Sequence, residues 1–177
     1  RRSKLILTTD LIGKSDEEIA ALAKNDPAQL NVEELLYAAT LTANKDEKIA
    51  IYNKVAELYN DYRAWNSIGQ IYFENGQIAS ARNCYNKALA IEPNNANVNY
   101  NAALAAMADN DLAKAEQYLG KAAGTDANLS AAMGTLYTMK GDYAAAKKAY
   151  GASATNNAAV QQILDENYTA ALQTLNK

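Results

Sequence analysis

Apolar residues recur along this chain at helical spacing, and polar or charged residues occupy the faces between them. Clusters of glycine, asparagine and aspartate, such as ENGQ, DND and KGD, separate successive apolar stretches and are typical of turns between helices. Ser15 with Glu18 and Asn31 with Glu34 have capping-box spacing, which marks two helix starts. The pattern therefore predicts a chain of short amphipathic helices.

Comparison of the chain with itself shows that this pattern repeats. Small residues of one unit return as small residues in the next units, and large apolar residues mostly return as large ones. Each unit contains two predicted helices, and a pair of this kind buries its apolar face only by stacking on its neighbours. The repeating positions are Gly69, Tyr72, Gly76, Ala81, Tyr85 and Ala88, then Ala103, Ala106, Asn110, Ala115, Leu119 and Ala122, then Gly134, Tyr137, Gly141, Ala146, Tyr150 and Ser153.

Further units precede and follow these three. IYNKVAEL aligns with CYNKALAI and defines an earlier, degenerate unit, in which Lys48 stands at a position that calls for a small residue. DENYTAALQTL resembles MKGDYAAAKKAY and indicates a last unit with a shortened first helix. The predicted units cover residues 29–61, 62–95, 96–126, 127–151 and 152–177.

Residues 1–28 are predicted to be an N-terminal helical extension or a degenerate repeat. Within them, SDEEIAALAK reads as a capped amphipathic helix. The preceding KLILTTDLI is either a partner helix or a short strand. We favour the helix, because an isolated strand in an all-helical array has no edge with which to pair.

The best-matched unit resembles the tetratricopeptide repeat, whose signature is W-x2-L-G-x2-Y…A-x3-F…P. Isoleucine stands for the leucine of this signature and tyrosine for the phenylalanine. The resemblance implies an all-α fold, a right-handed superhelix of about five stacked antiparallel helix pairs. The residues that carry it are Trp65, Ile68, Gly69, Tyr72, Ala81, Tyr85 and Pro93.

Packing explains the same positions independently of the family name. Small residues at Gly69, Ala103 and Gly134 allow the two helices of a pair to approach closely. Large aromatic residues, with Trp65 and Tyr85 among them, are expected to fill the space between one pair and the next.

Catalytic and metal chemistry finds no support in the composition. The chain has no histidine and one cysteine, Cys84, so the usual metal constellations and Cys-His or Ser-His pairs do not arise. We expect no enzyme activity, no catalytic residue, no bound metal and no cofactor. A formal net charge of −3, with lysines beside acids, also argues against nucleic acid as a partner.

The family resemblance implies that the first helices of the pairs line a concave wall that binds a peptide or a partner helix. Glu33, Thr40 and Ala131 are placed along the same wall. The residues expected to bind are Tyr37, Arg63, Asn66, Gln70, Phe73, Asn97, Tyr100, Asn101, Leu104, Met107, Thr135 and Thr138.

Some members of the family hold acidic chaperone tails with a clamp of lysines, arginine and asparagines. In this chain Asn101 fits one clamp place, but Asn66, Asn97 and Ala131 stand where cations are needed. We therefore expect no such clamp and a neutral, extended or helical segment as the occupant. Because Phe73 and its apolar neighbours on the wall are not needed for packing within the pairs, a partner is expected to cover them.

The sequence thus predicts a non-catalytic protein- or peptide-binding scaffold for a partner of unspecified identity. The alternative is a structural spacer or assembly module of a larger envelope-associated protein. A looser resemblance to repeat segments of envelope-associated Bacteroidetes proteins favours the periplasm or outer membrane over the cytoplasm. The chain begins RRSK and shows neither a membrane-spanning segment nor a signal peptide, so we expect a processed protein or an excised segment.

Overall fold

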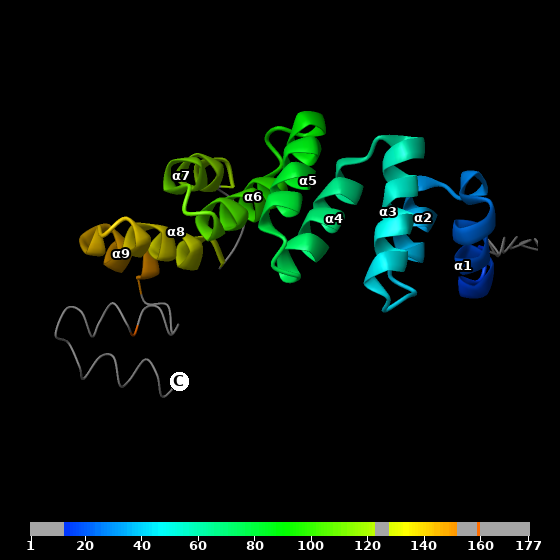
Figure 1. Ribbon diagram of the computed structural model, residues 1–177, viewed down its shortest axis with the longest axis horizontal. Coiled ribbons are helices and arrows are strands. Elements are labelled where there is room, and N and C mark those ends of the chain that lie inside the picture. The colour runs from blue at the N-terminus through cyan, green and yellow to red at the C-terminus, as the bar shows by residue number, and fades with distance from the viewer. Residues whose placement is uncertain (1–12, 123–127, 152–158, 160–177) are drawn as a thin grey trace, which may run out of the picture.

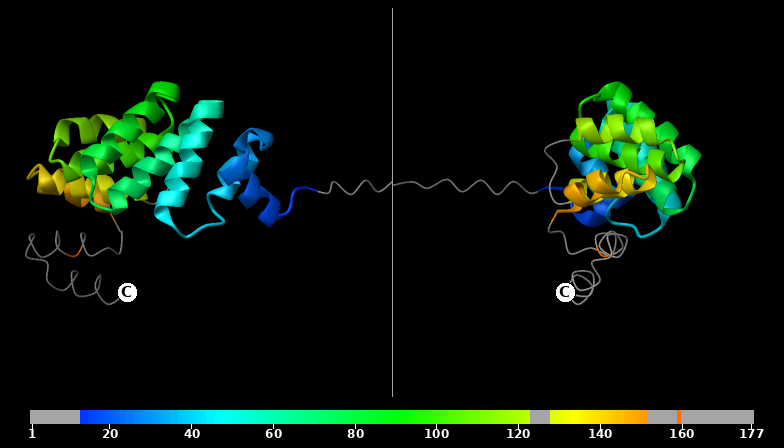
Figure 2. Two further views of the ribbon diagram at one scale, coloured as in Figure 1. Left: turned by 45° about the vertical axis from the view of Figure 1, so that its right-hand side comes forward. Right: turned by 90° about the vertical axis from the view of Figure 1, so that its left-hand side faces the viewer.

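The computed structural model describes residues 13–122, 128–151 and 159. In these residues all regular structure is helical, and the helices follow one another along an arch (Figure 1) that two further views show from other sides (Figure 2). None of the described helices is long and apolar enough to cross a bilayer. The helices are α1 (Asp16–Asn25), the 3-10 turn η1 (Pro27–Gln29), α2 (Val32–Ala38), α3 (Lys45–Tyr59), α4 (Tyr62–Glu74), α5 (Ile78–Ile91), α6 (Ala96–Ala108), α7 (Leu112–Lys121), α8 (Asn128–Met139) and α9 (Tyr143–Tyr150).

Four helix pairs make up most of the array: α2 with α3, α4 with α5, α6 with α7, and α8 with α9. The last three pairs pack more extensively within the pair than against neighbouring pairs. The first pair differs, because α3 packs more on α4 than on its own partner α2. The all-α solenoid of stacked helix pairs predicted from the sequence is thus confirmed. The predicted last unit and the helix or strand expected at the N-terminus lie outside the described residues, apart from residues 13, 14 and 159.

Both predicted capping boxes are present. The Glu18 amide donates to Ser15 Oγ at 3.2 Å, and the Ser15 amide donates to Glu18 Oε2 at 2.9 Å. In the second box the Glu34 amide donates to Asn31 Oδ1 at 2.9 Å, and the Asn31 amide donates to Glu34 Oε2 at 2.8 Å. Each box satisfies two backbone donors that a helix start leaves without partners, so α1 and α2 begin at the residues predicted for them.

The turns inside the last three pairs require a left-handed backbone. Gly76 and Gly141 have φ of +72° and +75°, and Asn110 takes the equivalent place with φ of +58°. Glycine adopts this conformation without strain, and asparagine tolerates it better than other side chains do. This explains why the ENGQ, DND and KGD clusters recur between paired helices.

The close contacts predicted within the pairs are confirmed at both glycines. A Cβ atom added to Gly69 would lie 2.6 Å from Cε1 of Tyr85, and one added to Gly134 would lie 2.4 Å from the Tyr150 ring. Ala103 stands at the equivalent place in the middle pair, where Leu119 replaces the tyrosine and both residues are buried in one cluster. A tyrosine therefore requires a glycine opposite it, whereas the smaller leucine leaves room for an alanine.

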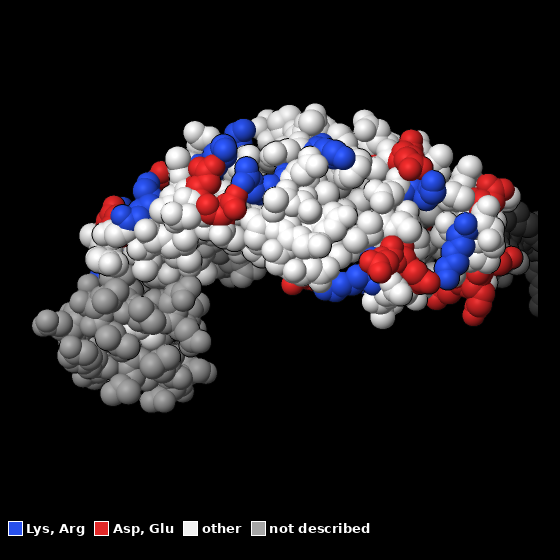
Figure 3. Space-filling model, viewed as in Figure 1, with Lys and Arg blue, Asp and Glu red and all other residues white. Residues whose placement is uncertain are grey.

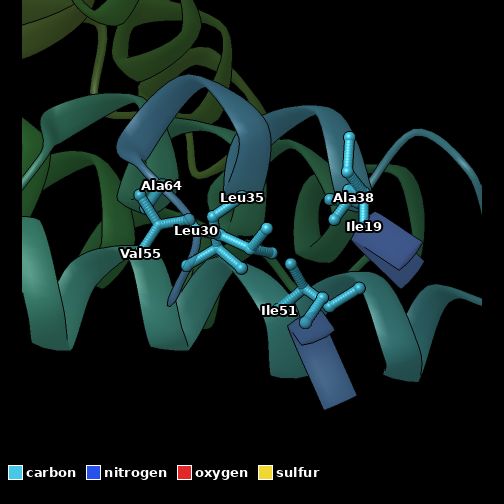
Figure 4. Close-up of a cluster of buried hydrophobic side chains, with 9 residues drawn as sticks. Ile19, Leu30, Leu35, Ala38, Ile51, Val55 and Ala64 are labelled. Carbon is cyan, nitrogen blue, oxygen red and sulfur yellow. The ribbon is translucent and has the colours of Figure 1, made fainter. Parts of the chain in front are cut away.

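The N-terminal helices share one hydrophobic cluster. Figure 4 shows side chains of α1 to α4 meeting there, with Ile19, Leu35, Val55 and Ala64 contributed by successive helices. Because α1 contributes Ile19 and Ala23 to this cluster, it caps the first pair and covers its apolar face.

The aromatic filling predicted between the pairs is only partly correct. Tyr85 is 2% exposed, but Trp65 is half-buried, and Lys87 Nζ lies 3.9 Å from the centre of its ring. In the next pair Asn99 stands at the place of the tryptophan and is fully buried. Asn99 Nδ2 donates to the Pro93 and Asn95 carbonyls at 3.0 and 2.8 Å. At this place an asparagine that hydrogen-bonds the connection between α5 and α6 therefore stands instead of an aromatic side chain.

Candidate functional site

The twelve residues predicted to bind a partner all lie on the first helices of the pairs, α2, α4, α6 and α8. Their apolar members are less available than predicted. Met107 is 7% exposed and belongs to the core around Leu119, so its prediction as a surface anchor is wrong. Tyr100 and Leu104 are half-buried and pack against the same core. These side chains fill the space between the third and fourth pairs, where neighbouring alanines leave room for them.

A surface depression lies instead at the N-terminal end of the wall. We call it the first hollow: it has a volume of about 510 Å³ and lies between α2, α3, α4 and the start of α6. Four of the twelve predicted residues line it: Tyr37, Arg63, Asn66 and Asn97. Its full lining is Glu33, Leu36, Tyr37, Thr40, Tyr52, Tyr62, Arg63, Asn66, Ser67 and Asn97.

A second hollow of about 230 Å³ adjoins the first, and Tyr52 and Ser67 line both. Among the twelve predicted residues it contains Gln70. Its lining is Ala43, Lys45, Lys48, Tyr52, Ser67, Gln70, Ile71 and Glu74. We refer to the two hollows together as the N-terminal groove.

The degenerate first pair creates this groove. The second helix of this pair, α3, carries Tyr52 at the place of Tyr85, but the opposing place on α2 holds Leu36 rather than glycine. The leucine side chain prevents the tyrosine ring from stacking on the α2 backbone, and Tyr52 is half-buried at the surface between the hollows. The helix α2 is also only 7 residues long, whereas α4 has 13.

One cation is held between two carboxylates at the edge of the first hollow. Arg63 Nε and Nη2 donate to Asp61 at 2.9 and 2.7 Å, and Nη1 and Nη2 donate to Glu33 at 3.1 and 2.8 Å. The hydrogen bonds from Arg63 hold the pKa of Asp61 below its usual value, and the two carboxylates raise the pKa of Arg63. The guanidinium is therefore fully charged and already matched by protein acceptors.

Hydrogen bonds to neighbouring helices orient other side chains of the wall. The Tyr37 hydroxyl donates to Asp16 Oδ1 at 3.1 Å. This hydrogen bond and the negative charge of Asp16 raise the pKa of Tyr37. Asn101 Nδ2 donates to Asn66 Oδ1 at 3.0 Å, which holds the Asn66 amide plane between α4 and α6. The Asn66 amide still carries N–H donors for a ligand backbone in the first hollow.

The remaining predicted residues lie apart from the groove. Phe73 is half-buried against the core around Tyr85. The Thr135 and Thr138 hydroxyls donate to carbonyls of their own helix, at 2.9 and 2.8 Å. Sequence reasoning placed Glu33 and Thr40 on the wall but missed Tyr52 and Tyr62. The sequence did contain a signal for Tyr52: it aligns with Tyr85, but Leu36 stands where Gly69 lies opposite Tyr85, so the Tyr52 ring lacks the same space to pack within its pair.

Other features of the described chain lie apart from the N-terminal groove. A hollow of about 540 Å³ between α8 and α9 is lined mainly by small or apolar residues, Leu129 and Met133 among them, and by none of the twelve predicted residues. Cys84 is buried, and burial raises the pKa of its thiol, so it stays protonated at neutral pH. On the face shown in Figure 3, positive and negative side chains are interspersed.

The stacked helix pairs and the groove along their first helices define an α-solenoid of the kind that presents an extended binding surface. Residues 69–109 match the model of a family described as TPR repeat, the same family that the residues of this stretch resemble. This stretch runs from the middle of α4 to just beyond α6 and includes the best-matched unit only in part. No curated protein sequence matches the chain.

Solved structures share the fold at low sequence identity. A tetratricopeptide repeat protein from Parabacteroides merdae is 18% identical, with a TM-score of 0.74 over 90% of this chain and 69% of that one. MamA is 19% identical, with a TM-score of 0.64 over 86% of this chain and 90% of that one. Cut9-Hcn1, an APC/C hetero-tetramer, is 16% identical, with a TM-score of 0.74 over 91% of this chain and 35% of the matched chain. At these identities the likeness shows the fold.

Proposed function

We propose that this chain is a non-catalytic scaffold that binds a segment of a partner protein in its N-terminal groove. The observation that carries the proposal is the first hollow, which combines a volume of about 510 Å³ with tyrosines and amides from four different helices. A depression with a few convergent polar groups is the usual form of a binding site. It lies on the wall formed by first helices, where the tetratricopeptide resemblance places a ligand.

The groove suits an extended segment better than a compact ligand, because its two hollows adjoin along α4. The Asn66 and Asn97 amides line the first hollow and can hydrogen-bond the backbone of the segment, and the rings of Tyr37 and Tyr62 can make apolar contact with it. A short segment held in this way is expected to bind with a dissociation constant of about 1 μM, which corresponds to a binding free energy of about −8 kcal/mol.

The test is selection of peptides from a displayed library on the wild-type chain, followed by fluorescence anisotropy with the selected peptides. The variant Tyr37→Ala/Asn66→Ala removes one ring and one amide from the first hollow, and we expect it to weaken binding at least roughly tenfold. Tyr143→Ala is the matched control, because Tyr143 is as exposed as Tyr37, at 48% and 44%, but lies on α9. Equal binding by the wild type and both variants would contradict the proposed site.

The second candidate function is a structural spacer or assembly module of a larger envelope-associated protein. It is favoured by the likeness to Cut9-Hcn1, in which an array of this size matches 35% of one chain of an assembly. A library that yields no groove-dependent peptide supports this alternative. We also propose a periplasmic or outer-membrane-associated location over a cytoplasmic one, on the looser resemblance to Bacteroidetes envelope proteins, and cell fractionation tests it.

A further inference from the structure

We propose that the first hollow selects a positively charged side chain, a lysine or an arginine, within the bound segment. This inference rests on the proposed function and names the chemistry of its partner. It replaces the neutral segment expected from the sequence, because that expectation rested on the missing cations of the clamp and did not consider the carboxylates at the first hollow.

The balance of charge in the first hollow is the first argument. Among the described residues Arg63 is the one cationic side chain that lines it, and the Asp61 and Glu33 carboxylates both accept hydrogen bonds from its guanidinium. The three groups together carry a net negative charge. Asp16, which accepts the hydrogen bond from Tyr37, adds a further negative charge beside the hollow. An incoming carboxylate meets two repelling acids and an arginine that already uses four of its five N–H donors, whereas an incoming cation meets acceptors that have lone pairs left.

The Glu33 carboxylate is the group placed to receive the cation. Its side chain is 69% exposed although it is paired with Arg63, so its outer lone pairs face solvent and the first hollow. A carboxylate accepts up to about four hydrogen bonds, and Arg63 takes two of them. A lysine or arginine of the bound segment can therefore join the existing pair without breaking it.

The tyrosine rings are the second argument, independent of the carboxylates. Tyr37, Tyr52 and Tyr62 come from three different helices and line the same hollow. The face of an aromatic ring attracts a cation, and the attraction grows when the cation is shielded from water. The array already uses this contact elsewhere, where Lys87 lies over the ring of Trp65.

The second hollow directs the cation toward the first. Lys45 and Lys48 both line it, and Lys45 is bound to Asn75 at 2.7 Å and paired with Glu74 at 3.6 Å. With two lysines and one glutamate it is positive where the first hollow is negative. A segment that lies along the N-terminal groove is therefore expected to place its basic residue beside Glu33 and a neutral or acidic residue beside Lys48.

The experiment uses peptide libraries blocked at both termini, in which one position is fixed as Lys, Arg, Gln or Glu and the other positions are randomised. On the wild-type chain, the Lys and Arg pools are expected to bind roughly tenfold more tightly than the Gln pool, and the Glu pool least. Glu33→Gln is expected to abolish this preference. Glu57→Gln, which removes a glutamate paired with Lys54 on α3, is the matched control and is expected to retain it.

A second pair of variants separates the ring from the hydroxyl of Tyr37. Tyr37→Phe keeps the ring and frees Asp16, so the preference for Lys and Arg is expected to persist, whereas Tyr37→Ala is expected to reduce it. Circular dichroism and thermal melting check that each variant is folded. Equal binding of all four pools in a groove-dependent manner would overturn the charge inference and leave the proposed function standing. Binding of no pool would overturn both.

Discussion

Replacing Gly69 with alanine tests the packing rule that governs the helix pairs. The added Cβ would lie 2.6, 2.8 and 3.1 Å from three atoms of the Tyr85 ring, and this ring is 2% exposed and packed in the core, so the ring or its neighbours must shift to make room. Overpacking of this kind costs about 1 to 3 kcal/mol. Alanine also improves helix propensity by about 1 kcal/mol over glycine, which offsets part of the loss. We expect a net destabilisation of up to about 2 kcal/mol.

Gly120→Ala is the matched control for this substitution. Gly120 lies in α7, and a Cβ added there meets nothing within 4 Å. Only the propensity gain remains, so Gly120→Ala is expected to stabilise the chain by up to about 1 kcal/mol. The two substitutions are chemically identical and are expected to have opposite signs.

A compensating substitution makes the test sharper. The middle pair places Ala103 opposite Leu119, so Gly69→Ala combined with Tyr85→Leu copies a combination that the chain already uses. Tyr85→Leu alone is expected to destabilise, because the removed ring leaves a cavity. The double variant is expected to be more stable than the sum of the single effects predicts, by roughly 1 kcal/mol or more.

The measurement is urea unfolding followed by circular dichroism at 222 nm, with midpoints and slopes compared among the four variants and the wild type. Stabilisation by Gly69→Ala similar to that by Gly120→Ala would refute the reasoning, because the contact with Tyr85 would then be absent. Strict additivity in the double variant would also refute it, because the two residues would not be in contact.

Three further predictions follow from single interactions. Asn99→Ala loses two hydrogen bonds and is expected to lower the free energy of unfolding in urea by about 1 to 3 kcal/mol. Asn99→Asp places a carboxylate against the same two carbonyls, so it is expected to destabilise the fold more at pH 7, where the carboxylate is charged, than at pH 4. Reversing the charge of Arg82 or Asp109 alone is expected to lower the free energy of unfolding by up to about 1 kcal/mol, which thermal melting detects as a slightly lower melting temperature. Reversing both charges is expected to restore the stability, because the equivalent pair of the next unit, Glu116 with Lys140, already has the acid first and the base second. Arg63 lowers the pKa of Asp61, so this carboxylate stabilises the fold above its unfolded pKa of about 4, and the contribution is lost as the pH falls through the folded pKa. Asp61→Asn is therefore expected to reduce the loss of stability below about pH 4 when urea unfolding is measured as a function of pH.

The ion pairs between repeats show how far alignment of the units extends. Arg82 at the start of α5 pairs with Asp109 after α6, and one unit later Glu116 pairs with Lys140 at 2.8 Å. The two pairs occupy equivalent places with their charges exchanged. Because the geometry of stacking is the same at both junctions, either order of charges satisfies it.

The amino-acid sequence by itself determined the local structure and the repeat. The capping boxes at Ser15 and Asn31, the left-handed turn at Gly76 and the contact of Gly69 with Tyr85 all depend on residues within one unit. Such features are readable because helix periodicity and residue size fix which side chains meet inside a pair. The same reasoning placed the candidate residues on the first helices.

Only the tertiary structure decided which part of that wall is open. A side chain such as Met107 lies at a surface position of its own pair, and the next pair buries it. The first hollow opens because α2 is short and Leu36 keeps Tyr52 from stacking, and Arg63 meets Glu33 across 30 residues of sequence. Exposure in a solenoid depends on the spacing between neighbouring pairs, which helix lengths and side-chain volumes of two units set together.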